Sequence, residues 1–182
     1  MTIPNQLTLL RILLVPVFVL VFYLPYSWNN ILACGIFILA GLTDVLDGYL
    51  ARKLNQTSSL GAFLDPVADK LMVAVALVLL VQQDPAIELA LPAAVIIGRE
   101  ITVSALREWM AELGARSKVA VSVLGKVKTI AQMVALGFLI FNKSVLGIPV
   151  FEIGLILLYI AAILTLISMF QYLMAAWPKL RE

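Results

Sequence analysis

The segment DVLDGYLARKLNQTSSLGAFLDPVAD, residues 44–69, places four carboxylates within two otherwise apolar stretches. On a helix, residues three and four positions apart share a face, so Asp44 pairs with Asp47 and Asp65 pairs with Asp69. The two pairs face each other if their helices form a hairpin. Clustered carboxylates repel one another unless cations lie between them, and their oxygens are preferred ligands of hard divalent metals. The spacing therefore predicts a divalent metal site.

The whole chain is too apolar for an ordinary soluble domain. Of its 182 residues, 63% are hydrophobic and only 13% are charged, and the mean hydropathy is +1.05. A membrane-spanning helix needs about 20 apolar residues, so the chain has room for about six. We therefore expect an all-α, polytopic membrane protein with a single domain, residues 1–182. The predicted spans are residues 7–24, 31–50, 60–81, 87–109, 119–141 and 151–177.

The composition also restricts the chemistry. The chain contains no histidine, and Cys34 is its only cysteine. Histidine-based catalysis, disulfides within the chain and the usual zinc sites are therefore excluded. Carboxylates, lysines, arginines and hydroxyl groups remain for any reaction, and we expect Cys34 to pack as a small hydrophobic side chain.

The distribution of basic residues predicts how the chain is oriented. Lysines and arginines gather at residues 52–53, 107–118 and 179–181, whereas the alternate connections hold only Lys143. Because cytoplasmic loops carry an excess of basic residues, both termini should be cytoplasmic. In that topology the four aspartates and the charged residues of the later spans share one half of the bundle. We expect them to surround a polar cavity that faces the cytoplasm.

Charged residues within the predicted spans are functional candidates, because each costs about 2.5 to 3.5 kcal/mol on insertion scales. Arg99 and Arg107 lie about two turns apart on one helix and suit a phosphate, which guanidinium groups bind in bidentate fashion. Lys126 and Lys128 point about 200° apart, and Lys126 is preferred as a third cation. The structural alternatives are salt bridges for the aspartates, a membrane anchor for Arg107 and a headgroup contact for Lys70.

The segment formed by residues 44–69 resembles the signature of the CDP-alcohol phosphotransferase family. That signature is D-x-x-D-G-x-x-A-R, eight further residues, and G-x-x-x-D-x-x-x-D. Its specified positions are all filled here, by Asp44, Asp47, Gly48, Ala51, Arg52, Gly61, Asp65 and Asp69. The resemblance continues through PNQLTLLR (4–11), GREITVSALR (98–107) and GKVKTIAQM (125–133). Those segments look like the branch of the family that uses glycerol 3-phosphate.

The resemblance implies an activity and a set of residue roles. The activity is transfer of a phosphatidyl group from CDP-diacylglycerol to glycerol 3-phosphate, with release of CMP, by a homodimer in the bacterial cytoplasmic membrane. Two divalent cations, Mg²⁺ or Mn²⁺, would serve as cofactors, and no nucleic acid takes part. The implied metal ligands are Asp44, Asp47, Asp65 and Asp69, with Asp69 also the general base. The implied CDP-binding residues are Asn5, Thr8, Gly48, Ala51, Arg52 and Gly61. For this activity, the three cations already identified from their charge and helix positions, Arg99, Arg107 and Lys126, would bind the phosphate of the acceptor.

Other functions stay open at this point. The acceptor within the same family can be inositol phosphate, serine or choline, which would make less use of a phosphate-binding cluster when it is neutral or zwitterionic. A small cation transporter with aspartates along its path would carry metal ions or protons without releasing CMP. A purely structural membrane protein is a third alternative, and the four carboxylates argue against it.

Overall fold

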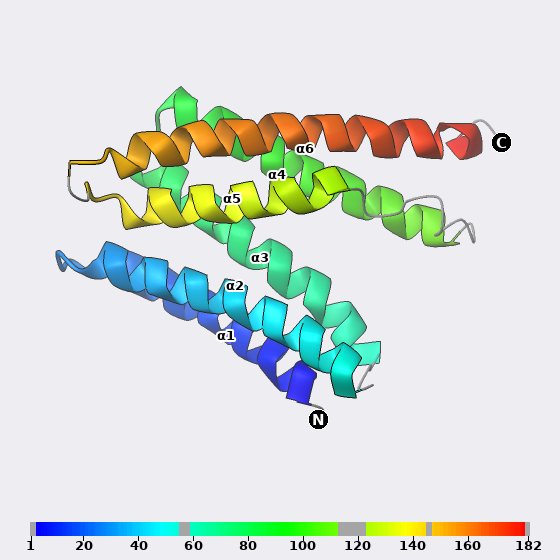
Figure 1. The fold of residues 1–182 in the computed structure, drawn as a ribbon, viewed down its shortest axis with the longest axis horizontal. Helices are drawn as coiled ribbons and strands as arrows, with labels where there is room; N and C mark the ends of the chain where they lie inside the picture. The colour runs from blue at the N-terminus through cyan, green and yellow to red at the C-terminus, as the bar shows by residue number, and fades with distance from the viewer. Residues whose placement is uncertain (1–2, 55–58, 113–122, 145–146, 181–182) are drawn as a thin grey trace.

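The computed structural model describes residues 3–54, 59–112, 123–144 and 147–180, and within them it contains six helices and no strand (Figure 1). The helices are α1 (Ile3–Phe22), α2 (Asn29–Leu54), α3 (Ser59–Gln83), α4 (Ile87–Glu112), α5 (Val123–Phe141) and α6 (Val150–Leu180). Each predicted span corresponds to one helix, so the all-α prediction is confirmed. The first and last helices extend beyond the predicted spans, to Ile3 and Leu180. Pro4 is compatible with that early start, because proline is tolerated in the first turn of a helix.

Among the described residues, four helices contain apolar windows long enough to cross a membrane. These windows are Asn5–Phe22, Asn29–Asp47, Ile87–Glu112 and Val150–Met174, and shorter apolar stretches occupy Lys70–Gln83 and Val127–Phe141. Large apolar side chains also face outward, such as Leu20 (70% exposed), Ile87 (72%) and Phe170 (65%). An apolar exterior on apolar helices is that of a multi-pass membrane protein.

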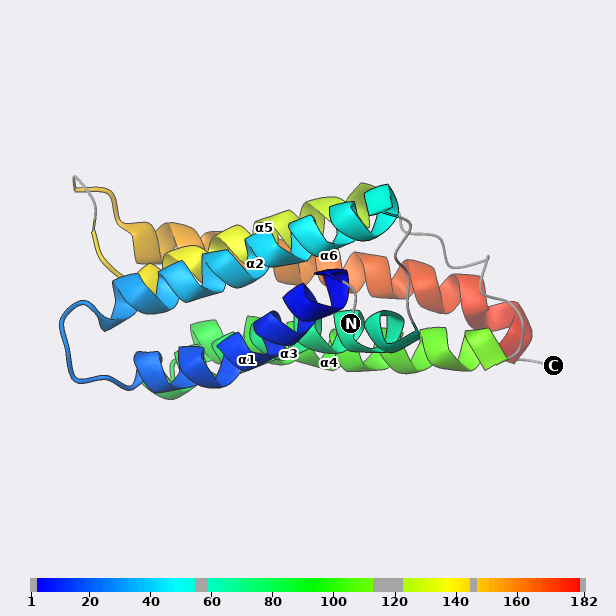
Figure 2. The same ribbon diagram turned by 90° about the horizontal axis from the view of Figure 1, so that it is seen from below.

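The helices form two groups that α2 and α5 bring together. One group packs α1 against α2 and α3, and the other packs α6 against α5 and α4. Contacts between α2 and α5 join the groups. Figure 1 shows these two helices close together near the start of α2 and the end of α5 and diverging from there, and Figure 2 shows them on the same side of the molecule. The two termini lie toward the same end of the bundle (Figure 1), as an even number of crossings requires.

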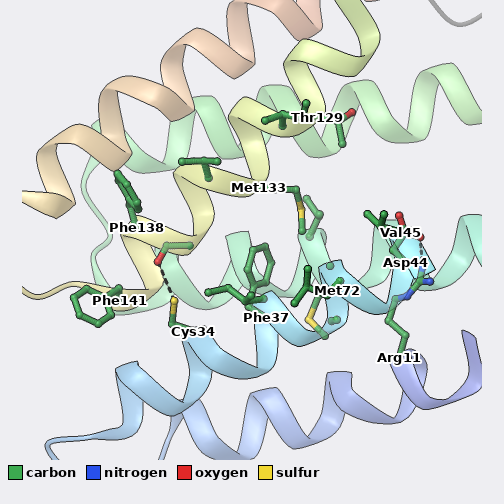
Figure 3. A pocket seen from close by; sticks show the side chains of 18 of the residues that line it. Arg11, Cys34, Phe37, Asp44, Val45, Met72, Thr129, Met133, Phe138 and Phe141 are labelled. Carbon is green, nitrogen blue, oxygen red and sulfur yellow. Dashed lines mark hydrogen bonds and ion pairs between the residues drawn. The ribbon is translucent and has the colours of Figure 1, made fainter. Parts of the chain in front are cut away.

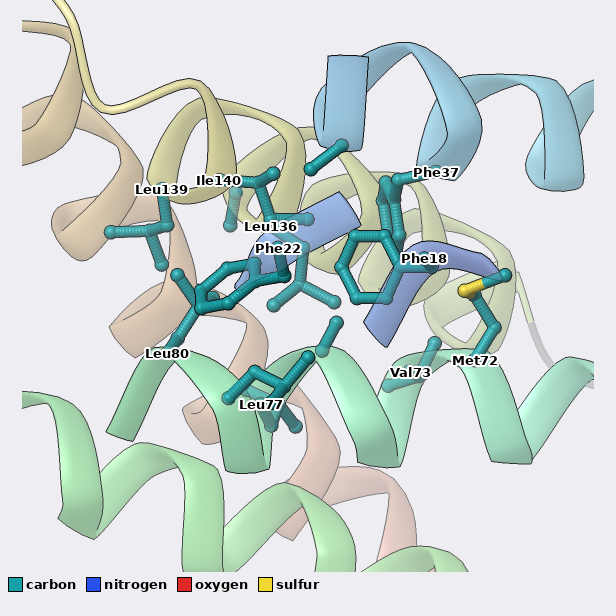
Figure 4. Packing of buried hydrophobic residues seen from close by; sticks show 14 of the residues in the cluster. Phe18, Phe22, Phe37, Met72, Val73, Leu77, Leu80, Leu136, Leu139 and Ile140 are labelled. Carbon is teal, nitrogen blue, oxygen red and sulfur yellow. The ribbon is translucent and has the colours of Figure 1, made fainter. Parts of the chain in front are cut away.

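Aromatic and aliphatic side chains lock α1, α2, α3 and α5 together (Figure 4). Phe18 and Phe37 are almost fully buried, and their ring centroids lie 6.4 Å apart. Leu77 and Leu136, both with no exposed surface, pack into the same cluster from α3 and α5. This rigid core lies two to three turns along α1 and α2 from their polar residues, so it fixes how those polar side chains meet.

The second group depends on a close approach of α5 and α6. An added Cβ at Gly154 would lie 3.0 Å from Phe138 Cβ and 3.2 Å from the backbone oxygen of Ala135. Only a residue without a side chain therefore fits at this crossing. Small residues at helix contacts are the usual means of bringing membrane helices into backbone contact, where packing rather than water exclusion stabilises the pair.

Candidate functional site

Arg11 of α1 bridges the first pair of signature carboxylates. Its Nη1 lies 2.5 Å from Asp44 Oδ1, and its Nη2 donates to Asp47 Oδ2. Asp44 and Asp47 stand one turn apart on α2, so both oxygens reach the same planar guanidinium. The Arg11 side chain is 2% exposed and that of Asp47 is 7% exposed, whereas that of Asp44 is 47% exposed. One carboxylate is thus buried while the other opens to its surroundings.

Two further polar residues of α1 lie on the same buried face as Arg11. Asn5 is 6% exposed and Thr8 is fully buried, at intervals of three residues that place all three side chains on one side of the helix. The Thr8 hydroxyl lies 3.4 Å from Asp47 Oδ2, as a long hydrogen bond. A polar stripe on α1 therefore faces the carboxylates of α2. It includes both α1 residues that the family resemblance assigns to CDP binding.

Several of the predicted site residues lie outside the described side chains. They are Gly48, Ala51, Arg52, Asp65, Asp69 and Lys126, whose backbones belong to α2, α3 and α5. Gly61 is described and is buried in α3. Within the described side chains there is no group of three or more potential metal ligands, and the facing of the two aspartate pairs stays a prediction.

The donor chemistry of Asp44 and Asp47 fits a divalent cation. Carboxylate oxygens are hard ligands of the kind that Mg²⁺ and Mn²⁺ prefer. Arg11 holds one oxygen of each aspartate, which fixes the orientation of both carboxylate groups. Asp44, whose side chain is 47% exposed, lies at the end of a large groove. These two residues therefore form half of the predicted ligand set.

A second polar cluster crosses α4, α5 and α6. Arg99 Nη1 lies 2.7 Å from Glu100 Oε1, and Lys128 Nζ lies 3.0 Å from the same oxygen. Arg99 also donates through Nη2 to Ser168 of α6 at 3.1 Å. Arg99 and Lys128 are each 6% exposed. Two buried cations therefore share one carboxylate, an arrangement that leaves an excess of positive charge.

Arg107 extends this cluster toward the end of α4. Its Nη2 donates to the hydroxyl of Tyr172 at 2.8 Å, and its guanidinium carbon lies 5.1 Å from the centroid of the same ring. Arg99 lies 5.7 Å from that centroid. Both arginines of the predicted phosphate site are thus held against one aromatic ring of α6, which supplies cation–π attraction to each. Their separation of about two turns on α4 makes this sharing possible.

Lys70 connects the signature segment to the second cluster. It follows Asp69 directly in the sequence and donates to the hydroxyl of Ser104 on α4. Ser104 in turn donates to the backbone oxygen of Glu100, one turn earlier, at 2.5 Å. The lysine therefore contacts a neighbouring helix instead of extending toward the headgroup region.

An apolar groove of about 680 Å³ runs between α2 and α5 and ends at Arg11 and Asp44 (Figure 3). Its described lining also includes Met72 and Val73 of α3, Phe37 and Ile38 of α2, and Met133, Val134, Phe138 and Phe141 of α5. The described cavity is thus polar at one end and apolar along most of its length. It suits an amphiphile whose charged end meets the carboxylates and whose apolar part lies between the helices.

Comparison with known proteins shows to which family the chain belongs. The sequence profile described as CDP-alcohol phosphatidyltransferase matches residues 1–168. The chain belongs to the CDP-alcohol phosphatidyltransferase family. This agrees with the signature that residues 44–69 complete at every specified position.

Relatives within this family match the chain over its full length. The CDP-diacylglycerol–glycerol-3-phosphate 3-phosphatidyltransferase of Pseudomonas fluorescens is 58% identical over 182 residues, covering 100% of this chain and 93% of the relative. Proteins of the same name from Escherichia coli (strain K12) and Shigella flexneri serotype 5b (strain 8401) are 56% identical over 180 residues. Each alignment covers 99% of this chain and 97% of the relative.

The structure of this family member adds residues that were absent from the predicted site. Arg11 contacts both aspartates of α2, Glu100 and Lys128 complete the cluster around Arg99, and Tyr172 supports both arginines. The sequence contained a signal for Arg11, Glu100 and Lys128, because each is a charge inside a predicted span. It contained none for Tyr172, an uncharged residue in an apolar stretch.

Proposed function

We propose that the protein transfers the phosphatidyl group of CDP-diacylglycerol to glycerol 3-phosphate, giving phosphatidylglycerol phosphate and CMP, a step of phospholipid biosynthesis. The observation that carries this proposal is the 56–58% identity, over essentially the full length, to phosphatidyltransferases whose names state that donor and acceptor. The complete family signature in residues 44–69 supports it. The proposal treats residues 1–182 as a single catalytic membrane domain.

In this proposal the donor lipid lies with its headgroup beside the signature and an acyl chain in the groove between α2 and α5. The groove is apolar along most of its length and ends at Asp44, which supports that placement. The CDP group would contact Gly48, Ala51, Arg52 and Gly61, with Asn5 and Thr8 on the facing side. Glycines beside a ligand allow its phosphates to approach the helix backbone closely.

The proposed metal ligands are Asp44, Asp47, Asp65 and Asp69, and they would hold two divalent cations, Mg²⁺ or Mn²⁺. When bound, such cations neutralise the charge of a pyrophosphate and of its leaving group. Arg11 acts here as a positioning residue. By bonding to one oxygen of Asp44 and one of Asp47, it sets the direction in which both carboxylates present their remaining oxygens.

Asp69 is the proposed general base. Its carboxylate would accept the proton of the primary hydroxyl of glycerol 3-phosphate as that oxygen attacks the phosphorus attached to diacylglycerol. A new phosphorus–oxygen bond forms, the phosphorus–oxygen bond to CMP breaks, and CMP leaves with the electron pair. Lys70 follows Asp69 in the sequence and bonds to Ser104, which ties this part of α3 to α4.

The proposed acceptor site is built from Arg99, Arg107 and Lys126, and the contacts of Lys128 support adding it. Cations bind the phosphate of the acceptor and thereby hold its hydroxyl near the reacting phosphorus. Buried Arg99 and Lys128 share only one carboxylate, that of Glu100, so the described cluster keeps a net positive charge toward a phosphate. A serine acceptor has no phosphate to use that charge.

We further propose that the protein works as a homodimer in the bacterial cytoplasmic membrane with both termini in the cytoplasm. The basic residues at 52–53, 107–118 and 179–181 support that orientation. Its partners are then CDP-diacylglycerol, glycerol 3-phosphate and membrane lipids.

The test is CMP release by the purified protein in detergent with CDP-diacylglycerol and Mg²⁺. Glycerol 3-phosphate, serine and inositol phosphate are compared as acceptors, with Asp69→Asn as the control variant. We expect release only with glycerol 3-phosphate, loss of release in the variant, and loss on chelation that added Mg²⁺ reverses. Release with another acceptor would overturn the acceptor assignment, and ion flux without release from folded protein would favour a cation transporter.

A further inference from the structure

We infer that Gly137 of α5 sets how far an acyl chain of the lipid donor enters the groove between α2 and α5, and so determines chain-length preference. This inference rests on the proposed function, because it takes the occupant of the groove to be the donor lipid. Gly137 would thus determine donor specificity from a position on α5 that is distant from the polar end of the groove at Asp44.

The length of the groove matches the occupant. Its polar end is at Asp44 and its far end includes Cys34, ten residues away on α2. At about 1.5 Å per residue this distance is about 15 Å, which is half of the ~30 Å hydrocarbon core of a bilayer. The groove therefore extends over one leaflet, the depth that one acyl chain of a membrane lipid covers.

Two glycines of the described groove lining, Gly41 and Gly137, differ in the space beside them. An added Cβ at Gly41 would lie 3.0 Å from Met133 Cε, so α2 and the Met133 side chain already meet there. At Gly137 an added Cβ would meet no heavy atom within 4 Å, although the residue is buried and lines the groove. The unfilled space that a side chain could occupy therefore lies beside Gly137.

Cys34 of α2 lies opposite Gly137 of α5 and contacts it. Its Sγ lies 3.4 Å from the backbone oxygen of Gly137, across the groove (Figure 3). This contact fixes α2 next to α5, so the space beside Gly137 has a defined wall and cannot widen freely to accommodate a new side chain. A larger residue at position 137 would take the volume that the end of an acyl chain fills.

The experiment compares donors of two chain lengths in wild type and Gly137→Leu. CMP release is measured with dioctanoyl and dipalmitoyl CDP-diacylglycerol in mixed micelles at a fixed lipid mole fraction. We expect kcat/KM for the dipalmitoyl donor to fall by about tenfold or more, because several methylenes lose their place, and that for the dioctanoyl donor to change by less than about twofold. Gly35→Leu is the matched control, since Gly35 is an exposed α2 glycine with open space that does not line the groove.

The outcomes separate the inference from the proposed function. An unchanged donor ratio in active Gly137→Leu overturns the inference, whereas a wild-type protein that releases no CMP from either donor overturns the proposed function instead. A second measurement avoids reliance on the stability of the variant. A donor with a photoreactive diazirine near its chain end should crosslink wild-type residues 133–141 or the neighbourhood of Cys34, and crosslinks confined to other helices overturn the inference.

Discussion

At the scale of single residues, Arg11 is the side chain that orients the two described carboxylates of the proposed metal site. Its side chain is 2% exposed and pairs with two carboxylates, one of them buried. Lysine carries the same charge but presents a point charge in place of a planar fork, so it cannot bridge two oxygens in the same way. The geometry of both aspartates therefore depends on a guanidinium rather than on positive charge alone.

We expect Arg11→Ala to abolish measurable CMP release and to lower stability by about 3 kcal/mol or more, because Asp47 is left as an uncompensated buried charge. Arg11→Lys should restore much of the stability and little of the activity. Thermal unfolding in detergent and CMP release measure the two effects. Arg11→Lys with wild-type activity would show that bridging geometry is unimportant.

Glu100 is the carboxylate that Arg99 and Lys128 share. We expect Glu100→Gln to raise the KM for glycerol 3-phosphate about fivefold or more, since a neutral amide oxygen accepts from both cations more weakly than a carboxylate, and a loss of about 1 kcal/mol leaves them less well oriented. The KM for CDP-diacylglycerol should stay nearly constant. Steady-state kinetics with each substrate varied in turn measure these two KM values separately.

The control for that prediction is Glu88→Gln, which removes an exposed carboxylate from the same helix. It should leave both KM values unchanged. Equal effects of Glu100→Gln on both substrates would contradict a role in positioning the acceptor and would indicate a general structural defect.

At this scale the sequence indicates candidates by side-chain chemistry that is unusual for its setting, and the roles assigned to them stay predictions. Asp44, Asp47, Arg99 and Arg107 were all identified because a charge in an apolar segment needs a partner or a ligand. The sequence does not decide whether Lys126 or Lys128 faces the predicted cavity, because a uniformly apolar helix does not show which of its faces packs inward. Lys128 is buried against Glu100, whereas the preference for Lys126 stays a prediction.

At the scale of elements, the crossing of α5 and α6 leaves no room for an added side chain at Gly154. Gly154 faces the backbone oxygen of Ala135, which cannot move aside as the tip of a side chain can. Overpacking of this kind costs about 1 to 3 kcal/mol. An added methyl group should therefore destabilise the protein at Gly154 but not at Gly35, where a Cβ has open space.

We therefore expect Gly154→Ala to lower the midpoint of thermal unfolding, despite the better helix propensity of alanine. Gly35→Ala should leave the midpoint unchanged or raise it slightly, and it serves as the matched control. Equal midpoints for the two variants would show that α5 and α6 separate at no cost.

The number of helices was predictable from the lengths of apolar runs, but their pairing was not. In a soluble bundle an apolar stripe marks the face that packs. Here lipid covers the outer faces, so large apolar residues such as Leu20 and Ile87 are exposed and the stripe is lost. The pairing of α2 with α5, which forms the groove, therefore emerged only from the structure.

At the scale of the whole molecule, the positions of the chain ends follow from the number of crossings. With six crossings, the connection between α3 and α4 lies on the opposite side from the termini and from the connection between α2 and α3. Cysteine labelling tests this, because Cys34 is the only native cysteine and is buried. A Cys34→Ser background removes it.

In that background we expect Asp84→Cys to react with a membrane-impermeant thiol reagent added outside intact cells. Lys53→Cys should react only after the cells are opened. Both positions are exposed, Asp84 in the connection after α3 and Lys53 near the end of α2. Labelling of both from the same side would mean that α3 does not cross the membrane.

The ion pair between Arg11 and the two aspartates also bears on how the protein is made. When α1 leaves the ribosome, Arg11 has no carboxylate partner. When α2 follows alone, Asp44 and Asp47 lack the guanidinium of Arg11. Each helix alone enters hydrocarbon at a penalty that the pair largely cancels. The first two helices are therefore expected to partition into the bilayer together as a hairpin, so that the same two carboxylates also assist biogenesis.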